Sequence, residues 1–205
     1  MPKLQSKSKT TLKTGLRADQ DLYPTPKSCT EELLKREKFV GRIWECACGL
    51  GDISEVLLDE GHTVLSTDIV DHGYENLSAI ADFLQCTYSE SIPRNIVTNP
   101  PFKYANGFIK HGIELTKPHN GKLALFLRFN IAEGQKRYHE IWSKNPPARV
   151  WIFSKRQTLW RGKEKKPKGR SGTTAYAWYI WEGGTAPGDT RMKWIEPWVL
   201  TELLF

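Results

Sequence analysis

Residues 40–61 read VGRIWECACGLGDISEVLLDEG, and they are a strong indication of the fold class. The apolar run at 40–47 predicts a buried strand, and CGLGD turns the chain into a helix over ISEVLLDE that ends at Gly61. A second strand, TVLST at 63–67, follows and ends at Asp68. A strand, a glycine turn, a helix and another strand form the repeating unit of parallel α/β sheets.

The same alternation continues on both sides of this unit. Before it, YPTPKSCTEELLKRE at 23–37 predicts a Pro-containing segment and a helix capped by Ser28 or Thr30. After it, apolar runs predict strands at 79–84, 95–98, 122–129, 149–154 and 173–181, and helical spacing predicts helices at 106–116 and 134–143. The chain is therefore expected to form an α/β sheet with ligands beyond the carboxyl ends of its strands.

Length and composition favour one soluble domain with an acidic partner. The chain has 205 residues and a formal net charge of +7, which favours nucleic acid as a partner. Residues 1–20 are expected to be a disordered basic tail, and 21–205 a single domain. Because no apolar run is long enough for a membrane span or a secretion signal, we expect no membrane partner and a cytoplasmic location.

Neither the cysteines nor the histidines are spaced as metal ligands. The four cysteines include no CxxC pair, so free thiols are expected rather than a zinc site or a disulfide framework. The five histidines have no ligand spacing either, and we assign them no role. No metal is therefore expected.

A basic segment at 155–170 separates the last two predicted strands. It carries one aromatic residue, Trp160, among cations that can attract phosphates or equally form a solvated loop. The residues of this segment expected to bind nucleic acid are Arg156, Trp160, Arg161, Lys163, Lys165, Lys166, Lys168 and Arg170. Lys103 and Arg128 follow or end other strands and could likewise approach phosphates or remain solvated.

The glycine turn and Asp68 have the features of a nucleoside site. Gly49 and Gly51 let the backbone approach a ligand closely, and Asp68 at the end of a strand can accept two ribose hydroxyls. Ser54 stands where the dinucleotide fingerprint has its third glycine, which disfavours NAD. A ligand with adenosine and no phosphates, such as S-adenosylmethionine, requires only the turn and the carboxylate.

The strand at 95–98 ends in NPPF, residues Asn99, Pro100, Pro101 and Phe102. Two prolines stop a strand and hold the chain stiffly, which could be simple termination with a core aromatic. Taken with the glycine turn and Asp68 upstream, the tetrapeptide predicts a catalytic site instead.

Read in order, YPTP, ECACGLGD, TDI, ADFL and NPPF resemble the motif series of class I S-adenosylmethionine-dependent methyltransferases. The likeness is to the amino-methyltransferases that act on adenine in DNA and covers most of residues 21–182, and the stretches 126–156 and 175–184 resemble their small phage-type members. The resemblance implies a Rossmann-like, mostly parallel seven-stranded sheet with one antiparallel strand and helices on both faces. It also implies double-stranded DNA as the partner, in a bacterial or phage-infected cell.

The resemblance also implies roles for individual residues. NPPF matches the catalytic tetrapeptide, residues 99–102. The residues that match the cofactor-contacting positions are Thr25, Pro26, Glu45, Ala47, Gly49, Gly51, Asp68, Ile69, Asp82, Phe83 and Asn99. Two departures are the unusual lead-in ECAC and the absence of a separate target-recognition domain, which leaves sequence specificity open.

The tetrapeptide suits methylation of the amino group of a base. Because the lone pair of this group is delocalised into the base ring, the nitrogen is a poor nucleophile and must be oriented. The side-chain oxygen of Asn99 and the carbonyl of Pro100 can each accept one N–H and aim the nitrogen. Phe102 can stack on a base flipped from the duplex. Cytosine C5 chemistry is disfavoured because no cysteine follows a proline.

Three functions remain open from the sequence. The first is adenine N6-methylation of DNA, and the second is methylation of an RNA base or a protein glutamine. The third is a nucleic-acid-binding module that has lost catalysis. The sequence does not indicate the recognition site or the oligomeric state.

Overall fold

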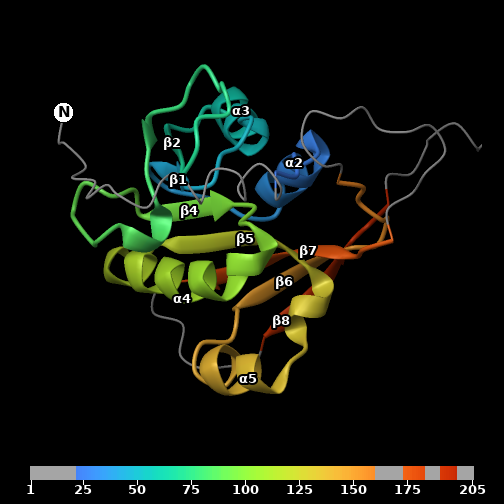
Figure 1. Cartoon of the computed structure of the whole chain (residues 1–205). Coiled ribbons are helices and arrows are strands. Elements are labelled where there is room, and N and C mark those ends of the chain that lie inside the picture. The colour runs from blue at the N-terminus through green and yellow to red at the C-terminus, as the bar shows by residue number, and fades with distance from the viewer. Residues whose placement is uncertain (1–21, 160–172, 183–189, 198–205) are drawn as a thin grey trace, which may run out of the picture.

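The computed structural model describes residues 22–159, 173–182 and 190–197. They form one eight-stranded sheet with helices on both faces (Figure 1). The α-helices and strands are α2 (Lys27–Leu34), β1 (Ile43–Glu45), α3 (Asp52–Asp59), β2 (Val64–Asp68), β3 (Ala79–Ile80), β4 (Asn95–Thr98), α4 (Ala105–Thr116), β5 (Lys122–Arg128), α5 (Gln135–Arg137), β6 (Arg149–Phe153), β7 (Tyr176–Glu182) and β8 (Arg191–Ile195). The short 3₁₀ and π turns are η1 (Phe83–Gln85), η2 (Phe102–Tyr104), η3 (Lys117–His119), η4 (Phe129–Ala132) and η5 (Tyr138–Trp142).

The strand order is β3-β2-β1-β4-β5-β7-β6-β8. Every neighbouring pair is parallel except the two that β7 makes with β5 and β6. The carboxyl ends of β1, β2, β4, β5 and β6 therefore meet at one edge of the sheet, together with the start of β7. This confirms the expected α/β class and its antiparallel strand.

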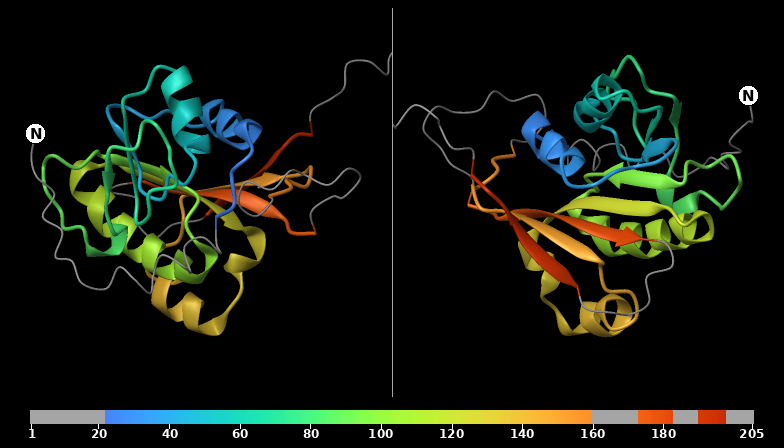
Figure 2. Two further views of the ribbon diagram at one scale, coloured as in Figure 1. Left: turned by 45° about the horizontal axis from the view of Figure 1, so that its top comes forward. Right: turned by 180° about the vertical axis from the view of Figure 1, so that it is seen from behind.

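The described sheet has one strand more than the expected seven. The addition is β8, which pairs in parallel with β6 at the sheet edge (Figure 2). Its first four residues are exposed and only Ile195 is buried, so no apolar run marks it in the sequence. Trp194 in this strand is 64% exposed.

Helices cover the sheet on both faces, as the continuous apolar run of β5 requires. Its side chains alternate between the two hydrophobic clusters of the protein. Leu123, Leu125 and Leu127 pack in the cluster that contains residues of α4. Ala124 and Phe126 pack in the cluster that contains residues of α2 and α3. Figure 2 shows α4 on the opposite side of the sheet from α2 and α3.

The start of α2 differs from the expectation of a side-chain cap. The residue before the helix is Pro26, and no side chain caps the first turn. The predicted caps Ser28 and Thr30 lie inside the helix, two and four residues after Pro26, so neither is placed to cap it. Pro26 fixes its own φ at the turn into the helix, and its carbonyl accepts from Cys29 N at 2.8 Å.

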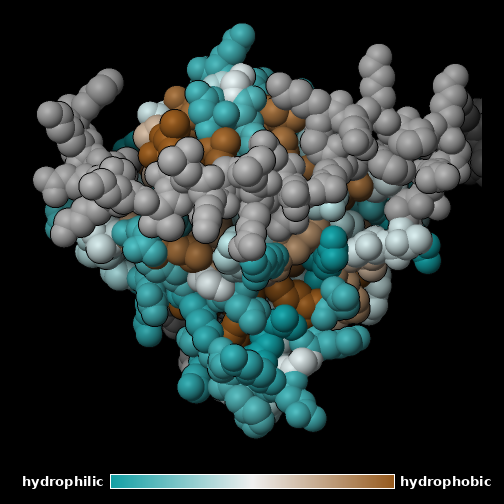
Figure 3. All heavy atoms as spheres, in the orientation of Figure 1, coloured by the Kyte–Doolittle hydropathy of each residue, from teal (hydrophilic) through white to brown (hydrophobic). Residues whose placement is uncertain are grey.

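The described surface gives no sign of a membrane segment. None of the described helices has both the length and the apolar content that a membrane crossing requires. On the face drawn in Figure 3, the lower part around α5 is mostly hydrophilic. The described residues also contain no cluster of three or more side chains that could hold a metal ion.

Candidate active site

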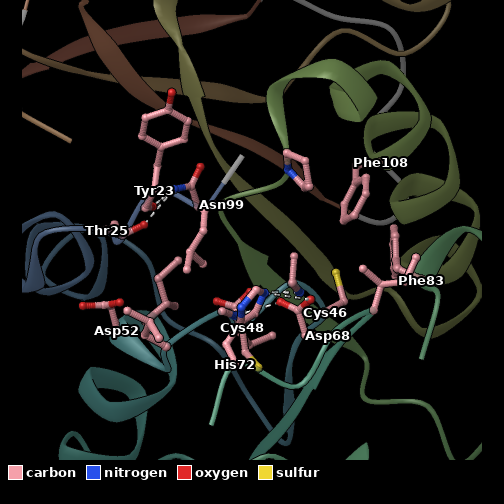
Figure 4. Close-up of a pocket in the computed structure, with 18 of the residues that line it drawn as sticks. Tyr23, Thr25, Cys46, Cys48, Asp52, Asp68, His72, Phe83, Asn99 and Phe108 are labelled. Carbon is pink, nitrogen blue, oxygen red and sulfur yellow. Dashed lines mark hydrogen bonds and ion pairs between the residues drawn. The ribbon is translucent and has the colours of Figure 1, made fainter. Parts of the chain in front are cut away.

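One cavity of about 220 Å³ opens at the carboxyl ends of β1, β2 and β4 (Figure 4). Its wall is formed by the segment before α2, the glycine turn, the end of β2, the η1 turn and the tetrapeptide after β4. This is the edge at which open α/β sheets bind ligands.

The glycine turn after β1 folds back against β2. Cys48 N donates to the Thr67 carbonyl over 3.0 Å, and Gly51 N donates to the Cys48 carbonyl over 2.8 Å. Gly49 has φ +54° and Gly51 has φ +88°, a region that disfavours residues with a Cβ. A Cβ on Gly51 would also lie 2.2 Å from the Tyr74 ring. The turn therefore requires glycine at position 51 for both backbone and space.

Gly51→Ala should lower the free energy of unfolding by about 2–4 kcal/mol, through strain at positive φ and overlap with Tyr74. Gly61→Ala is the matched control because Gly61 has φ +81° and no atom within 4 Å of the added Cβ. It should cost only about 1–2 kcal/mol. Urea titrations of both variants measure the difference, and equal losses would contradict a steric role for Tyr74.

Asp68 fixes the turn from the end of β2. Its Oδ2 accepts from Gly49 N at 2.8 Å and its Oδ1 accepts from Val70 N at 3.1 Å. His72 Nε2 lies 3.9 Å from Oδ1. Each carboxylate oxygen has more than one lone pair, so Asp68 can also accept hydrogen bonds from a ligand in the cavity.

Glu45 is a buried carboxyl group at the end of β1 and lines the cavity. Its Oε1 accepts from Ala47 N at 3.3 Å, and its buried Oε2 has no hydrogen-bond partner in the described part of the chain. Burial raises the pKa of Glu45 to about 8. The side chain is therefore protonated at neutral pH and is suited to ionise beside a cation.

The stability of the ligand-free protein should fall as pH rises from about 4.5 to about 8, because folded Glu45 keeps a proton that the unfolded chain loses near 4.5. Below that window the contribution of Glu45 is fully present, and above it the contribution is lost. Glu45→Gln should remove this part of the slope. Denaturant titrations across the pH range measure it, and parallel profiles for the two proteins would contradict the assignment.

The four residues of the tetrapeptide after β4 differ in their position relative to the cavity. Asn99 and Pro101 line the cavity, whereas Pro100 is buried and Phe102 lies beside the cavity rather than in its wall. Asn99 Nδ2 donates to the Tyr23 carbonyl at 3.1 Å and to Thr25 Oγ1 at 2.9 Å. Figure 4 shows these two bonds as dashed lines.

Phe102 lies within a small group of aromatic and cationic side chains. The Arg128 guanidinium carbon is 3.8 Å from the centre of the Phe102 ring, and Tyr23 and Tyr176 lie 5.4 and 6.2 Å from it. Arg128 therefore packs on this ring as a cation–π partner rather than extending into solvent. The predicted phosphate contact of Arg128 would require it to leave the ring.

Asp82 and Phe83 each have a structural role and also line the cavity. Asp82 Oδ1 caps the η1 turn by accepting from Leu84 N at 3.0 Å. The Phe83 ring packs 5.3 Å from Trp44 and 4.7 Å from Phe108. Both residues nevertheless line the cavity. A planar group could lie against this apolar wall.

Most of the predicted cofactor residues line this one cavity. They are Thr25, Glu45, Ala47, Gly49, Asp68, Ile69, Asp82, Phe83 and Asn99. Pro26 and Gly51 do not line it; Pro26 precedes α2 and Gly51 shapes the turn.

Sequence reasoning missed several residues of the cavity wall. They are Leu22, Tyr23, Pro24, Cys46, Cys48, Leu50, Asp52, Ile53, His72, Ala81, Leu84, Tyr104 and Phe108. Tyr104 and Phe108 follow the tetrapeptide at helical spacing, which could have identified them. His72 had been assigned no role, but its side chain is 8% exposed and faces the cavity. Burial raises the thiol pKa values of Cys46 and Cys48, so both thiols stay protonated.

The predicted nucleic-acid contacts are only partly within the described residues. Lys103 and Arg156 are exposed, and β6 ends at Phe153 on the same sheet edge as the cavity. Leu159 packs on the same hydrophobic cluster as Phe102. Trp160, Arg161, Lys163, Lys165, Lys166, Lys168 and Arg170 lie outside the described residues, as does the predicted tail at 1–20.

Comparison with known proteins gives likenesses of structure only. No protein-family model and no curated protein sequence matches the chain. A candidate RNA methyltransferase from Pyrococcus horikoshii has a TM-score of 0.58 at 13% identity, over 80% of this chain and 88% of that one.

Two further solved structures have TM-scores of 0.51. A SAM-dependent O-methyltransferase from Thermotoga maritima matches at 16% identity, over 78% of this chain and 66% of that one. The modification subunit of a candidate type I restriction enzyme from Vibrio vulnificus matches at 14% identity, over 89% of this chain and 50% of that one. At these identities the likeness establishes a Rossmann-like fold that is shared with methyltransferases.

Proposed function

We propose that this protein is an S-adenosylmethionine-dependent methyltransferase that modifies the exocyclic N6 amino group of adenine in double-stranded DNA. The observation that carries the proposal is the convergence of two motifs on one cavity. Asn99 of the tetrapeptide and Asp68 of the nucleoside motif come from different strands and line the same space. An acceptor for an amino group thus lies on the same cavity as an acceptor for a ribose.

The residues of the cavity fit this cofactor. Asp68 retains lone pairs for ribose hydroxyls, and the turn at Gly49 brings backbone to the cavity wall. The unpaired Oε2 of Glu45 favours a cationic ligand, since a nearby positive charge would offset the cost of ionising the buried carboxyl. When bound, the cofactor supplies a methyl group already activated on a cationic sulfonium.

The chain's own contribution to the reaction is orientation. The side-chain oxygen of Asn99 and the carbonyl of Pro100 each accept one N–H of the target amine, which aims its lone pair. Proline supplies a carbonyl without a competing N–H. Phe102 would hold the plane of the base once Arg128 moves from its ring. No strong base is required before transfer, because the proton can leave afterwards.

DNA is the proposed partner because of the net positive charge of the chain and the position of its basic segment. The net charge of +7 attracts a polyanion, and the basic segment starts at the sheet edge that carries the cavity. A base inside a duplex cannot reach a cavity of this kind, so it must flip out of the helix. We place this activity in the cytoplasm, where the cofactor and DNA are both present.

The test is to incubate the protein with methyl-labelled S-adenosylmethionine and, separately, duplex DNA, structured RNA or a glutamine-containing protein. Nuclease digestion and mass spectrometry identify the product. Duplex DNA should yield N6-methyladenine, and a duplex made only of G·C pairs should yield none. N6-methyladenine with RNA alone, or methylglutamine alone, would overturn DNA as the substrate. Absence of cofactor binding would support an inactive binding module.

A further inference from the structure

The side chain of Asn99 is held in one orientation by the segment before α2. Its Nδ2 donates to the Tyr23 carbonyl at 3.1 Å and to Thr25 Oγ1 at 2.9 Å. A carbonyl oxygen can only accept, so the nitrogen end of the amide must face Tyr23. Oδ1 makes no hydrogen bond within the described part of the chain and is left to accept from a ligand.

The holding segment is short and stiff. Tyr23 and Thr25 alternate with Pro24 and Pro26, and each proline fixes one φ angle. The Tyr23 ring also packs 5.4 Å from Phe102. One segment thus contacts both ends of the tetrapeptide, its amide and its aromatic ring.

We propose that Thr25 is a positioning residue for methyl transfer, in addition to lining the cofactor cavity. An amide free to turn about its last torsion would present NH2 to the target amine in half of its orientations, and two donors cannot bond to each other. The Tyr23 carbonyl disfavours that orientation because it can only accept, and the Thr25 hydroxyl oxygen stabilises the productive one with a second bond from the same Nδ2. This inference rests on the proposed function, because only an amino-group methyltransferase would bind a target amine at Asn99.

Thr25 is well placed for such a role. Its side chain is almost completely buried, at 4% exposure for the residue, so water does not compete well for its oxygen. Its own hydroxyl proton has no acceptor within the described residues and can be donated into the cavity. The hydroxyl can therefore contact a ligand and hold Asn99 at once.

The experiment compares Thr25→Val, which keeps the shape of the side chain and removes the acceptor, with Thr25→Ser, which keeps the hydroxyl. At saturating cofactor and DNA, Thr25→Val should lower kcat about 10- to 100-fold with little change in the KM for DNA. Thr25→Ser should retain most of the rate. Thr116→Val is the matched control: Thr116 is equally buried but bonds the Gly112 carbonyl within α4. It should leave kcat unchanged.

A second readout does not depend on activity. In the free protein, the side-chain NH2 signals of Asn99 in a ¹⁵N NMR spectrum should shift in Thr25→Val and stay near their wild-type positions in Thr25→Ser. Shifted signals with no methylated product from any substrate would refute the proposed function and keep Thr25 as the partner of Asn99. Unchanged signals and kcat in Thr25→Val, or equal losses in both variants, would overturn the positioning role.

Discussion

Asn99→Ala should reduce methyl transfer to DNA on the order of 1,000-fold and should change cofactor affinity far less. The amide oxygen is one of two proposed acceptors for the target amine, and orientation of the reacting atoms is the main source of catalysis expected here. Alanine removes that acceptor and adds no bulk. Single-turnover methylation measures the rate, and isothermal titration with the cofactor measures the affinity.

Asn106→Ala is the matched control for this substitution. Asn106 lies in α4, where its Oδ1 accepts from Arg137 Nε at 2.7 Å, and it does not line the cavity. Methylation by this variant should match that of the wild type. An Asn99→Ala protein with the wild-type rate would remove Asn99 from the mechanism.

Asp68→Ala should weaken cofactor binding by at least about 100-fold. Two hydrogen bonds from a ribose to a carboxylate are lost, and bonds to charged groups contribute about 1.5–3 kcal/mol each. The variant also leaves Gly49 N and Val70 N without their present acceptor. Isothermal titration with S-adenosylmethionine measures the change in Kd.

Asp71→Ala controls for the loss of one negative charge on the same loop. Asp71 is exposed, accepts from Gly73 N at 2.7 Å, and does not line the cavity. Its cofactor affinity should stay close to that of the wild type. Equal affinity in both variants would contradict the assignment of Asp68 to the ribose.

The sequence predicted the fold where apolar patterns are strong. The run at 122–129 is β5, with alternate side chains in the two core clusters, and the glycine turn lies between β1 and α3. It failed to predict β8, whose exposed side chains give no apolar signal. Local pattern is thus informative where a strand buries side chains on at least one face.

The cavity was predictable in part because its motifs are short and local. Gly49, Asp68 and Asn99 each follow a predicted strand, and parallel strands bring their carboxyl ends together. The bonds from Asn99 to residues 23 and 25 were not predictable, since no local pattern encodes a contact across the fold. Arg128 was expected to approach a phosphate or to remain solvated, because its stacking on Phe102 depends on tertiary packing that no local pattern shows.

The two bonds of Asn99 reach back 76 and 74 residues along the chain. Bringing such distant positions together costs loop-closure entropy, and local contacts do not offset this cost. This part of the site should therefore form late in folding. Unfolding is expected to begin at the same segment, residues 22–26. A local opening of residues 22–26 would release the amide while the strands remain paired, because no strand includes that segment. The orientation of the Asn99 amide is therefore expected to be less stable than the sheet itself.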